Sequence, residues 1–168
     1  MKIVITGFMG SGKTRLAREL ARRLSLEMVD LDDRITEREG RSPAQLIIDE
    51  GEEAFRPIES DILRELLETD RTQVIALGGG AWIVEANRDL INQYGCLTVW
   101  VDTPFEVCWY RITVSDEDRP LARTRDQAKT LFDQRKPIYR LAKIHVQVTG
   151  QEYLDSLVAR IEKDVQSL

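Results

Sequence analysis

The chain has 168 residues, of which 42% are hydrophobic and 32% are charged. A chain of this length buries about 70% of its unfolded surface, so we expect one domain that folds without a metal or a disulfide. This composition excludes a disordered chain, a collagen and a disulfide scaffold. The formal net charge of −5 has the wrong sign for bulk attraction to nucleic acid or to an anionic membrane, and neither is expected as a partner.

Cysteine spacing and hydropathy both favour a cytoplasmic protein. Cys96 and Cys108 stand apart without a C-x-x-C or Cys/His pattern, which argues against paired thiols and against a zinc site. No apolar run approaches the ~20 residues that cross a bilayer. Glycines begin at Gly7, where a signal peptide would have its apolar core. Free thiols fit a reducing compartment, so a soluble cytoplasmic protein is expected.

Short apolar segments alternate with amphipathic ones along the chain. Strands are predicted at residues 2–6, 27–30, 72–77, 96–101 and 144–148. A helix is predicted over 13–24, where apolar residues recur every three or four positions opposite a row of arginines. Capping boxes that begin at Ser42, Thr103 and Thr149 predict three further helix starts. The alternation predicts an α/β protein with a mostly parallel sheet.

One stretch has no such periodicity. Residues 113–125 read TVSDEDRPLARTR, a polar sequence with three arginines. A loop of about a dozen residues is unusually long for a compact domain, and this one is predicted to be an exposed lid.

The most informative motif follows the first predicted strand. Residues 7–14 read GFMGSGKT, which fits G-x-x-x-x-G-K-T between a strand and a helix, the context that a phosphate-binding loop requires. Glycines let backbone N–H groups turn toward the phosphates, and the helix N-terminus adds its dipole. Lys13 would reach the β and γ phosphates of a nucleotide, and the Thr14 hydroxyl would bind Mg²⁺.

The second predicted strand ends in acidic residues. Asp30 and Asp32 are two positions apart and point the same way at the carboxyl end of a strand, where open α/β sheets bind ligands. One carboxylate would hold Mg²⁺ through water, and the other would accept a proton from a substrate hydroxyl. The alternative is an acidic helix N-cap, which Asp32 or Asp33 would supply.

Glycines and arginines complete the set of candidate ligand-binding residues. The third predicted strand runs into Gly78, Gly79 and Gly80, which would let a ligand contact backbone N–H groups with no Cβ in the way. Most arginines are solvated or form weak surface ion pairs, so each one alone is a weak candidate. The arginines singled out by their positions are Arg56, Arg119, Arg123, Arg135 and Arg140.

The phosphate loop alone does not name a reaction, because switches, motors and small-molecule kinases all use it. No N-K-x-D guanine signature occurs, which argues against a GTPase switch. Asp102 ends a strand as in a motor ATPase, but Thr103 and Pro104 follow in place of a catalytic glutamate. Asp102 is therefore interpreted as part of a helix start.

Taken together, these motifs resemble the shikimate kinases, which belong to the nucleoside-monophosphate-kinase-like group of P-loop phosphotransferases. The resemblance runs from GFMGSGKT through DLD, GRSPAQLIIDEGEEAFRPIE, LGGGAW and DRPLA to RKPIYR. It implies a three-layer fold with a five-stranded parallel sheet in the order 2-3-1-4-5 and a mobile lid. It also implies one P-loop kinase domain over 1–168, with substrate binding at about 31–62 and the lid at about 113–125.

The resemblance further implies an activity and the roles of individual residues. The activity is transfer of the γ-phosphoryl of ATP to the 3-hydroxyl of shikimate, on the route to chorismate and the aromatic amino acids, by a monomer that uses Mg²⁺. The implied catalytic residues are Lys13, Asp32 and Arg119. The implied ATP-binding residues are Gly10, Ser11, Gly12, Lys13, Thr14, Arg15, Arg111 and Arg119. The implied metal-binding residues are Thr14 and Asp30. The implied shikimate-binding residues are Asp32, Arg56, Gly78, Gly79, Gly80 and Arg140.

The chain departs from the family pattern at a few positions. Ala17 replaces a frequent glycine, and residues 143–149 lack the usual aspartate, so adenine contacts are not assigned there. His145 is interpreted as a structural residue of the last strand. Pro57 directly follows Arg56, and proline disfavours helical geometry in the residue before it, so the helix carrying Arg56 is expected to start or bend there.

Two other functions remain open from the sequence. A related kinase acting on another polyol acid, such as gluconate, would need the same carboxylate-binding arginines. A nucleotide-binding regulator that has lost catalysis would lack Lys13, Asp32 or Arg119, and all three are present.

Overall fold

The computed structural model describes residues 1–71, 73–149 and 154–166. Its strands form a parallel sheet in the order β2-β3-β1-β4-β5, which confirms the predicted fold class and strand order. The strands are β1 (Ile3–Thr6), β2 (Glu27–Asp30), β3 (Gln73–Ala76), β4 (Leu97–Asp102) and β5 (Ile144–Gln147). Each lies within one residue of its predicted bounds.

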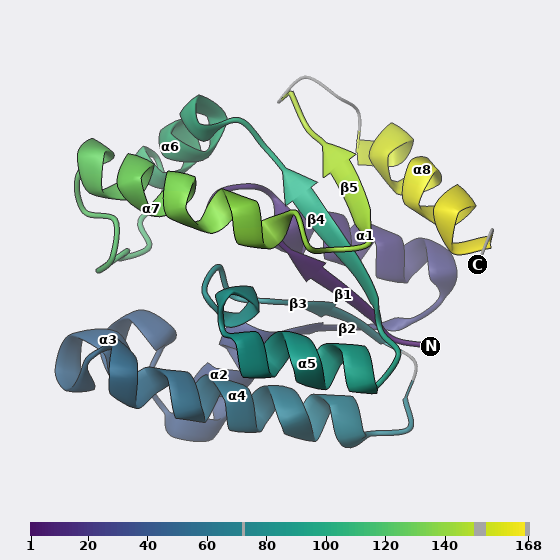
Figure 1. Ribbon diagram of the computed structural model, residues 1–168, viewed down its shortest axis with the longest axis horizontal. Coiled ribbons are helices and arrows are strands. Elements are labelled where there is room, and N and C mark those ends of the chain that lie inside the picture. The colour runs from purple at the N-terminus through teal and green to yellow at the C-terminus, as the bar shows by residue number, and fades with distance from the viewer. Residues whose placement is uncertain (72, 150–153, 167–168) are drawn as a thin grey trace.

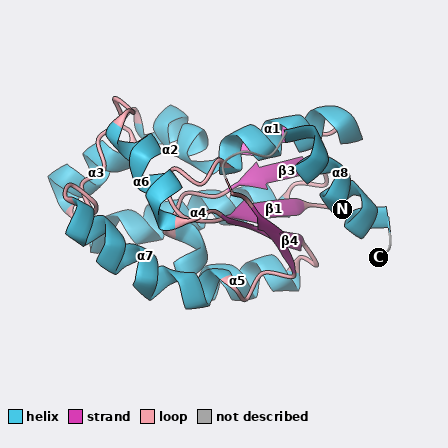
Figure 2. Ribbon diagram, turned by 90° about the horizontal axis from the view of Figure 1, so that it is seen from above, coloured by secondary structure: helices cyan, strands magenta, loops and turns pink. Residues whose placement is uncertain are grey.

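Helices cover both faces of the sheet and make three layers (Figures 1 and 2). Helices α1 and α8 pack on one face, while α4, α5 and α7 cover the other. The helices on the first face are α1 (Lys13–Leu24) and α8 (Leu154–Gln166). The others are α2 (Leu31–Glu39), α3 (Pro43–Glu50), α4 (Glu52–Glu68), α5 (Glu85–Gln93), α6 (Phe105–Thr113) and α7 (Arg125–Tyr139), with a 3-10 turn η1 (Ala81–Ile83). In the described residues no helix has the length and apolarity needed to cross a membrane.

The continuous apolar run of β1 reflects burial on both faces. Ile3 and Ile5 pack in the cluster that contains Leu16 of α1, whereas Val4 packs in the opposite cluster with Leu63 of α4. All three strand residues are fully buried. A central parallel strand therefore needs no polar alternation, and its polar chemistry is confined to the loop at its carboxyl end.

Two of the three predicted capping boxes can be compared with the structure. Ser42 caps α3, since its hydroxyl accepts a hydrogen bond from the Gln45 backbone N–H at 3.2 Å. The box at Thr103 is wrong, because its hydroxyl donates to the Ser11 carbonyl at 2.9 Å, and Pro104 is the N-cap of α6. Thr103 thus ties the end of β4 to the phosphate loop. The box that begins at Thr149 requires Glu152, which lies outside the described residues.

Pro57 does not mark the start of a helix. Helix α4 begins at Glu52, after Gly51 with φ of +88°, and Pro57 lies inside it. Because proline has no N–H, the carbonyl of Glu53 loses its usual helical donor. Arg56 therefore belongs to the first turns of a helix that continues through the proline.

Trp82 of η1 connects the segment after β3 to α7. Its indole N–H donates to the Ile138 carbonyl at 2.9 Å, and its side chain is 1% exposed. We expect Trp82→Phe to lower the free energy of unfolding by roughly 1 to 3 kcal/mol, because it removes both a buried hydrogen bond and packed volume. Urea denaturation followed by circular dichroism measures this loss. Tyr110→Phe, at an exposed aromatic, is the control and should change stability by less than about 0.5 kcal/mol; equal effects of the two would contradict the assigned role.

Candidate active site

A cleft of about 790 Å³ lies at the carboxyl edge of the sheet. Its walls come from the phosphate loop, the starts of α2 and α3, the first turns of α4, the glycines after β3 and the lid segment. Parallel strands deliver these segments to one edge, on the side where α2, α3 and α6 lie in Figure 1. The cleft is therefore the place where most of the predicted site residues meet.

The phosphate loop has the geometry that an anion requires. Gly12, with φ of +97°, is the N-cap of α1 and provides no side-chain cap, so the first N–H groups of the helix stay free for a ligand. Gly10 has φ of +73°, and a Cβ there would meet the Cys108 carbonyl oxygen at 2.7 Å. Both positions require glycine for their backbone conformation, and Gly10 requires it also for the close approach of α6.

Lys13 lies inside the loop that it would serve. Its Nζ donates to the Phe8 carbonyl at 3.0 Å. Burial lowers the pKa of Lys13 to about 8, although the carboxylates of Asp32 and Asp30 oppose this shift. A phosphate bound at the loop would replace the carbonyl as the partner of the ammonium group and favour its charged form.

Asp30 both caps a helix and contacts the phosphate loop. One carboxylate oxygen accepts a hydrogen bond from the Asp32 backbone N–H at 3.0 Å and caps α2. The other accepts from the Thr14 hydroxyl at 2.8 Å. The N-cap is thus Asp30, and neither Asp32 nor Asp33, which leaves the Asp32 side chain free to face the cleft.

Asp32 lies against the glycines that follow β3. A Cβ on Gly78 would meet its Oδ1 at 2.6 Å, so only glycine fits beside this carboxylate. Burial raises the pKa of Asp32 to about 6, with a further contribution from Asp30, while Lys13 and Arg119 oppose the rise. Asp32 is consequently ionised at neutral pH yet close enough to titration to exchange a proton.

A buried carboxylate holds Arg56 in the cleft. Nη1 of Arg56 donates to Oε2 of Glu59 at 2.6 Å, and Glu59 is only 1% exposed. Burial raises the pKa of Glu59 to about 7, and the charge of Arg56 opposes this rise. A Cβ on Gly80 would overlap the guanidinium of Arg56, so the guanidinium packs directly against the backbone of Gly80.

Arg135 also lines the cleft, near Glu52 and Gly79, and the sequence assignment did not choose it. Arg135 is 5% exposed and lines the cleft, whereas Arg140 is exposed at the C-cap of α7 and does not line it. The two lie five residues apart, which turns them about 140° from each other around a helix. Arg135 lies on the buried face of α7 with Phe132 and Tyr139. These residues are three and four positions apart, and this helical spacing could have indicated from the sequence that Arg135 is on the buried face.

Tyr139 connects Arg135 to the glycines. Its hydroxyl donates to the Gly79 carbonyl at 2.5 Å, and a hydrogen bond also links its side chain to Arg135. Burial raises the pKa of Tyr139 to about 12, so the phenol stays a donor at all ordinary pH values. The glycine segment and the arginine are held by one buried side chain.

The predicted lid connects α6 to α7 and carries Arg119 to the cleft. Arg119 pairs with Glu117, and its charge acts on both Lys13 and Asp32. Its Nε is buried without a hydrogen-bond partner among the described residues, a position suited to a ligand oxygen. Arg15 lines the cleft from its exposed position, and Arg111 donates to the Gly10 carbonyl at 3.1 Å.

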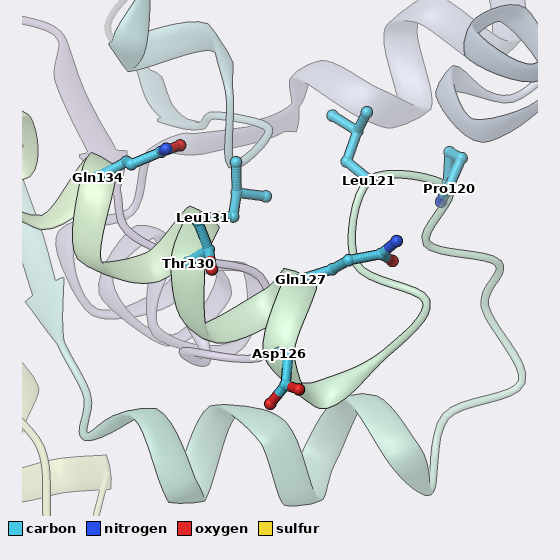
Figure 3. A pocket seen from close by; sticks show the side chains of 7 residues that line it. All are labelled: Pro120, Leu121, Asp126, Gln127, Thr130, Leu131 and Gln134. Atoms are coloured by element: carbon cyan, nitrogen blue, oxygen red, sulfur yellow. The ribbon is translucent and has the colours of Figure 1, made fainter.

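A second hollow, of about 450 Å³, lies between the lid and α7 (Figure 3). Pro120 and Leu121 of the lid line both this hollow and the cleft. The remaining lining residues belong to α7, and Gln127 extends toward the lid loop in Figure 3. The lid segment therefore separates the two spaces.

Comparison with known proteins agrees with this geometry. The model of the shikimate kinase family matches residues 9–166. This chain belongs to the shikimate kinase family. Among curated shikimate kinases, that of Salinibacter ruber is 37% identical over 96% of this chain and 82% of its own. A shikimate kinase of Thermus thermophilus is 36% identical over 96% of this chain and 88% of its own.

Solved structures of shikimate kinases also superpose closely. The shikimate kinase from Acinetobacter baumannii in complex with shikimate has a TM-score of 0.90 and 32% identity, covering 99% of this chain and 93% of that one. The shikimate kinase from Aquifex aeolicus has a TM-score of 0.83 and 34% identity, covering 99% and 96%. Family membership therefore rests on sequence and on fold alike.

The raised pKa of Glu59 makes stability depend on pH. Because its folded pKa of about 7 exceeds the ordinary 4.5, its contribution is fully present below about pH 4.5 and is lost as pH rises through 7. Between pH 4.5 and 7.5, the unfolding free energy of the parent should fall by up to about 3 kcal/mol relative to Glu59→Gln. Denaturant titrations across this range test it. The exposed neighbour Glu53→Gln should keep the parent slope; a Glu59→Gln slope equal to that of the parent would show that Glu59 titrates normally.

Proposed function

We propose that this protein transfers the γ-phosphoryl of ATP to the 3-hydroxyl of shikimate, giving shikimate 3-phosphate on the route to chorismate and the aromatic amino acids. The observation that carries the proposal is one cleft that joins a phosphate loop to Arg56, Arg135 and Asp32. The arginines suit the substrate carboxylate, and the aspartate suits its hydroxyls. Membership in the shikimate kinase family supports the same substrate.

ATP would bind through its phosphates at the loop. The free N–H groups at the start of α1 face the anion, and Lys13 exchanges the Phe8 carbonyl for a phosphate oxygen. Arg119 brings a second positive charge from the lid, where its unpartnered Nε–H donates to an oxygen of the transferred group. These two cations neutralise charge on the phosphoryl group, which is most of what a protein contributes to this reaction.

Magnesium fits the donor set beside the loop. The Thr14 hydroxyl and the Asp30 carboxylate are hard oxygen donors only 2.8 Å apart, and Mg²⁺ prefers oxygen. An ion held by these two residues would take its other ligands from phosphates and water. When bound there, Mg²⁺ would supply positive charge that offsets the charge of the phosphates.

Shikimate would occupy the half of the cleft between α2, α4 and the glycines after β3. Arg56 and Arg135 bind its carboxylate, and the backbone N–H groups of Gly78, Gly79 and Gly80 line the same pocket. Asp32 then faces the ring hydroxyls and either accepts the proton of the attacking hydroxyl or only orients it. We further propose that the chain acts as a monomeric single domain in the cytoplasm, where the buried thiols Cys96 and Cys108 stay reduced.

A coupled assay of ADP release tests the proposed reaction. The enzyme is supplied with ATP and Mg²⁺ and with shikimate, gluconate, quinate or a nucleoside monophosphate in turn. We expect the highest kcat/KM with shikimate. A higher kcat/KM with gluconate would assign the protein to the other polyol acid, and no turnover with any acceptor would favour a regulator.

The pKa values of Asp32 and Lys13 each predict one limb of a pH profile. Asp32 must be ionised, so kcat/KM for shikimate should fall below about pH 6, and Lys13 must be charged when ATP binds, so kcat/KM for ATP should fall above about pH 8. Asp32→Asn should lose the acid limb and about 10²- to 10⁴-fold in kcat, with nearly unchanged ATP affinity. Steady-state kinetics across pH 5 to 9.5 provide the test. If only the KM for shikimate rises, Asp32 orients the hydroxyl and is not a base.

Arg135 and Arg140 make opposite predictions when each is changed to lysine. Lysine keeps the charge but loses the planar pair of donors, so Arg135→Lys should lower kcat/KM for shikimate by about ten- to a hundredfold. Arg140→Lys, at an exposed position, should stay within about twofold of the parent. The KM for ATP should be unchanged in both. If only Arg140→Lys lowers kcat/KM for shikimate strongly, Arg140 binds the carboxylate, as the sequence assignment proposed.

A further inference from the structure

Glu52 is an acidic residue without a role in the proposed reaction, and it contacts the arginines of the cleft. Its Oε1 accepts hydrogen bonds from Nε and Nη2 of Arg56, at 3.2 and 2.5 Å. The same oxygen lies 3.9 Å from Nη2 of Arg135. An anionic oxygen of the protein itself thus lies between the two guanidinium groups that are proposed to bind the substrate carboxylate.

The two carboxylates that contact Arg56 differ in their freedom to move. Glu59 is 1% exposed and lies within α4, so its side chain cannot turn to solvent without leaving the core. Glu52 is 43% exposed and is the first residue of α4, directly after Gly51. An exposed glutamate at a helix start can rotate into water at little cost. Glu59 is therefore a fixed counter-ion, and Glu52 is a displaceable one.

The charges of the two arginines and two glutamates favour replacement of the Glu52 carboxylate by the substrate carboxylate. Binding of the substrate carboxylate beside Glu52 is less favourable. Above about pH 7, where Glu59 with its pKa of about 7 is ionised, Arg56 and Arg135 are balanced by Glu52 and Glu59, and a further carboxylate would leave the group with a net negative charge. When Glu52 turns to solvent, the group has one positive charge in excess, which matches one substrate carboxylate. Because an unbalanced charge is costly in a partly buried site, the neutral combinations are favoured.

We propose that Glu52 is a built-in competitor of the substrate: its carboxylate occupies the Nε and Nη2 edge of Arg56 in the free enzyme, and the substrate carboxylate displaces it. This inference rests on the proposed function, since it requires that the substrate carboxylate binds Arg56 and Arg135. Glu52 then sets the affinity for carboxylate substrates without taking part in the phosphoryl transfer. It also keeps both arginines paired when no substrate is present.

Removing the competing charge should tighten substrate binding. We expect Glu52→Gln and Glu52→Ala to lower the Kd for shikimate, measured by isothermal titration calorimetry without nucleotide, by about two- to tenfold. The KM should fall in parallel, and kcat at saturating shikimate should stay within about twofold. Glu53→Gln removes the same charge from the same helical turn and should leave Kd unchanged, because the ion pairs to Arg56 and Arg135 are made by Glu52 and not by Glu53.

A neutral ligand separates competition from a general effect on the cleft. The methyl ester of shikimate lacks the competing charge, so its Kd should be lowered less by Glu52→Gln than that of shikimate. An equal effect on both ligands, or a higher Kd for shikimate in both Glu52 variants, would overturn the proposal and make Glu52 a residue that positions Arg56. If the parent enzyme neither binds nor phosphorylates shikimate, the proposed function itself fails, and this outcome is distinct because it appears before any variant is compared.

Discussion

The parallel arrangement of the five strands is the constraint on which the site depends. Three adjacent strands, β2, β3 and β1, all end at the same edge. They deliver Asp30, the glycines that start at Gly78, and the phosphate loop to positions within reach of one another. With an antiparallel neighbour, one of these segments would lie at the opposite edge, and no cleft could contain all three.

Close packing across that edge explains the glycines better than flexibility does. Gly78 and Gly80 do not have left-handed backbone conformations, but the space that a Cβ would need is filled by Asp32 and by Arg56. The two glycines thus leave the space that the charged side chains of Asp32 and Arg56 occupy. Tyr139 holds the intervening Gly79 through its carbonyl, so the segment is fixed from the side of α7 as well.

Charge divides the cleft into two halves with different chemistry. In one half, the charges of Lys13 and Arg119 act on Asp32, and the first N–H groups of α1 have no side-chain cap. In the other half, Arg56 and Arg135 are matched by Glu59 and Glu52. Under the proposed function, phosphates would bind donors that have no partner, whereas the substrate carboxylate would displace the carboxylate of Glu52 from Arg56. The raised pKa of Glu59 reflects the cost of keeping the fixed partner buried.

Local sequence patterns were sufficient for the individual strands and for the phosphate loop, because both depend on short-range spacing, whereas the strand order was predicted from the family resemblance. The strand bounds, the helix at 13–24 and the acids after β2 follow from runs of a few residues. The helix start at Thr103 could not be predicted locally, since its hydroxyl binds the Ser11 carbonyl, which is distant in sequence.

Local sequence patterns also do not distinguish the candidate arginines of the site. Arg135 and Arg140 flank Tyr139 in the sequence, and only the buried face of α7 tells them apart. Glu52 likewise pairs with Arg56 of its own helix and contacts Arg135 of α7. The contact between the two helices cannot be predicted from the local sequence pattern. Contacts between helices, such as those that place Arg135 in the cleft, are therefore the ones that sequence reasoning could not supply.

A crystal structure with shikimate and a non-hydrolysable ATP analogue tests the division of the cleft most directly. The account predicts the substrate carboxylate within hydrogen-bond distance of Arg56 and Arg135, its 3-hydroxyl on Asp32 facing the γ-phosphate, and the Glu52 side chain turned to solvent. A carboxylate bound near Arg140, or a Glu52 that keeps its hydrogen bonds to Arg56 beside bound substrate, would contradict the account.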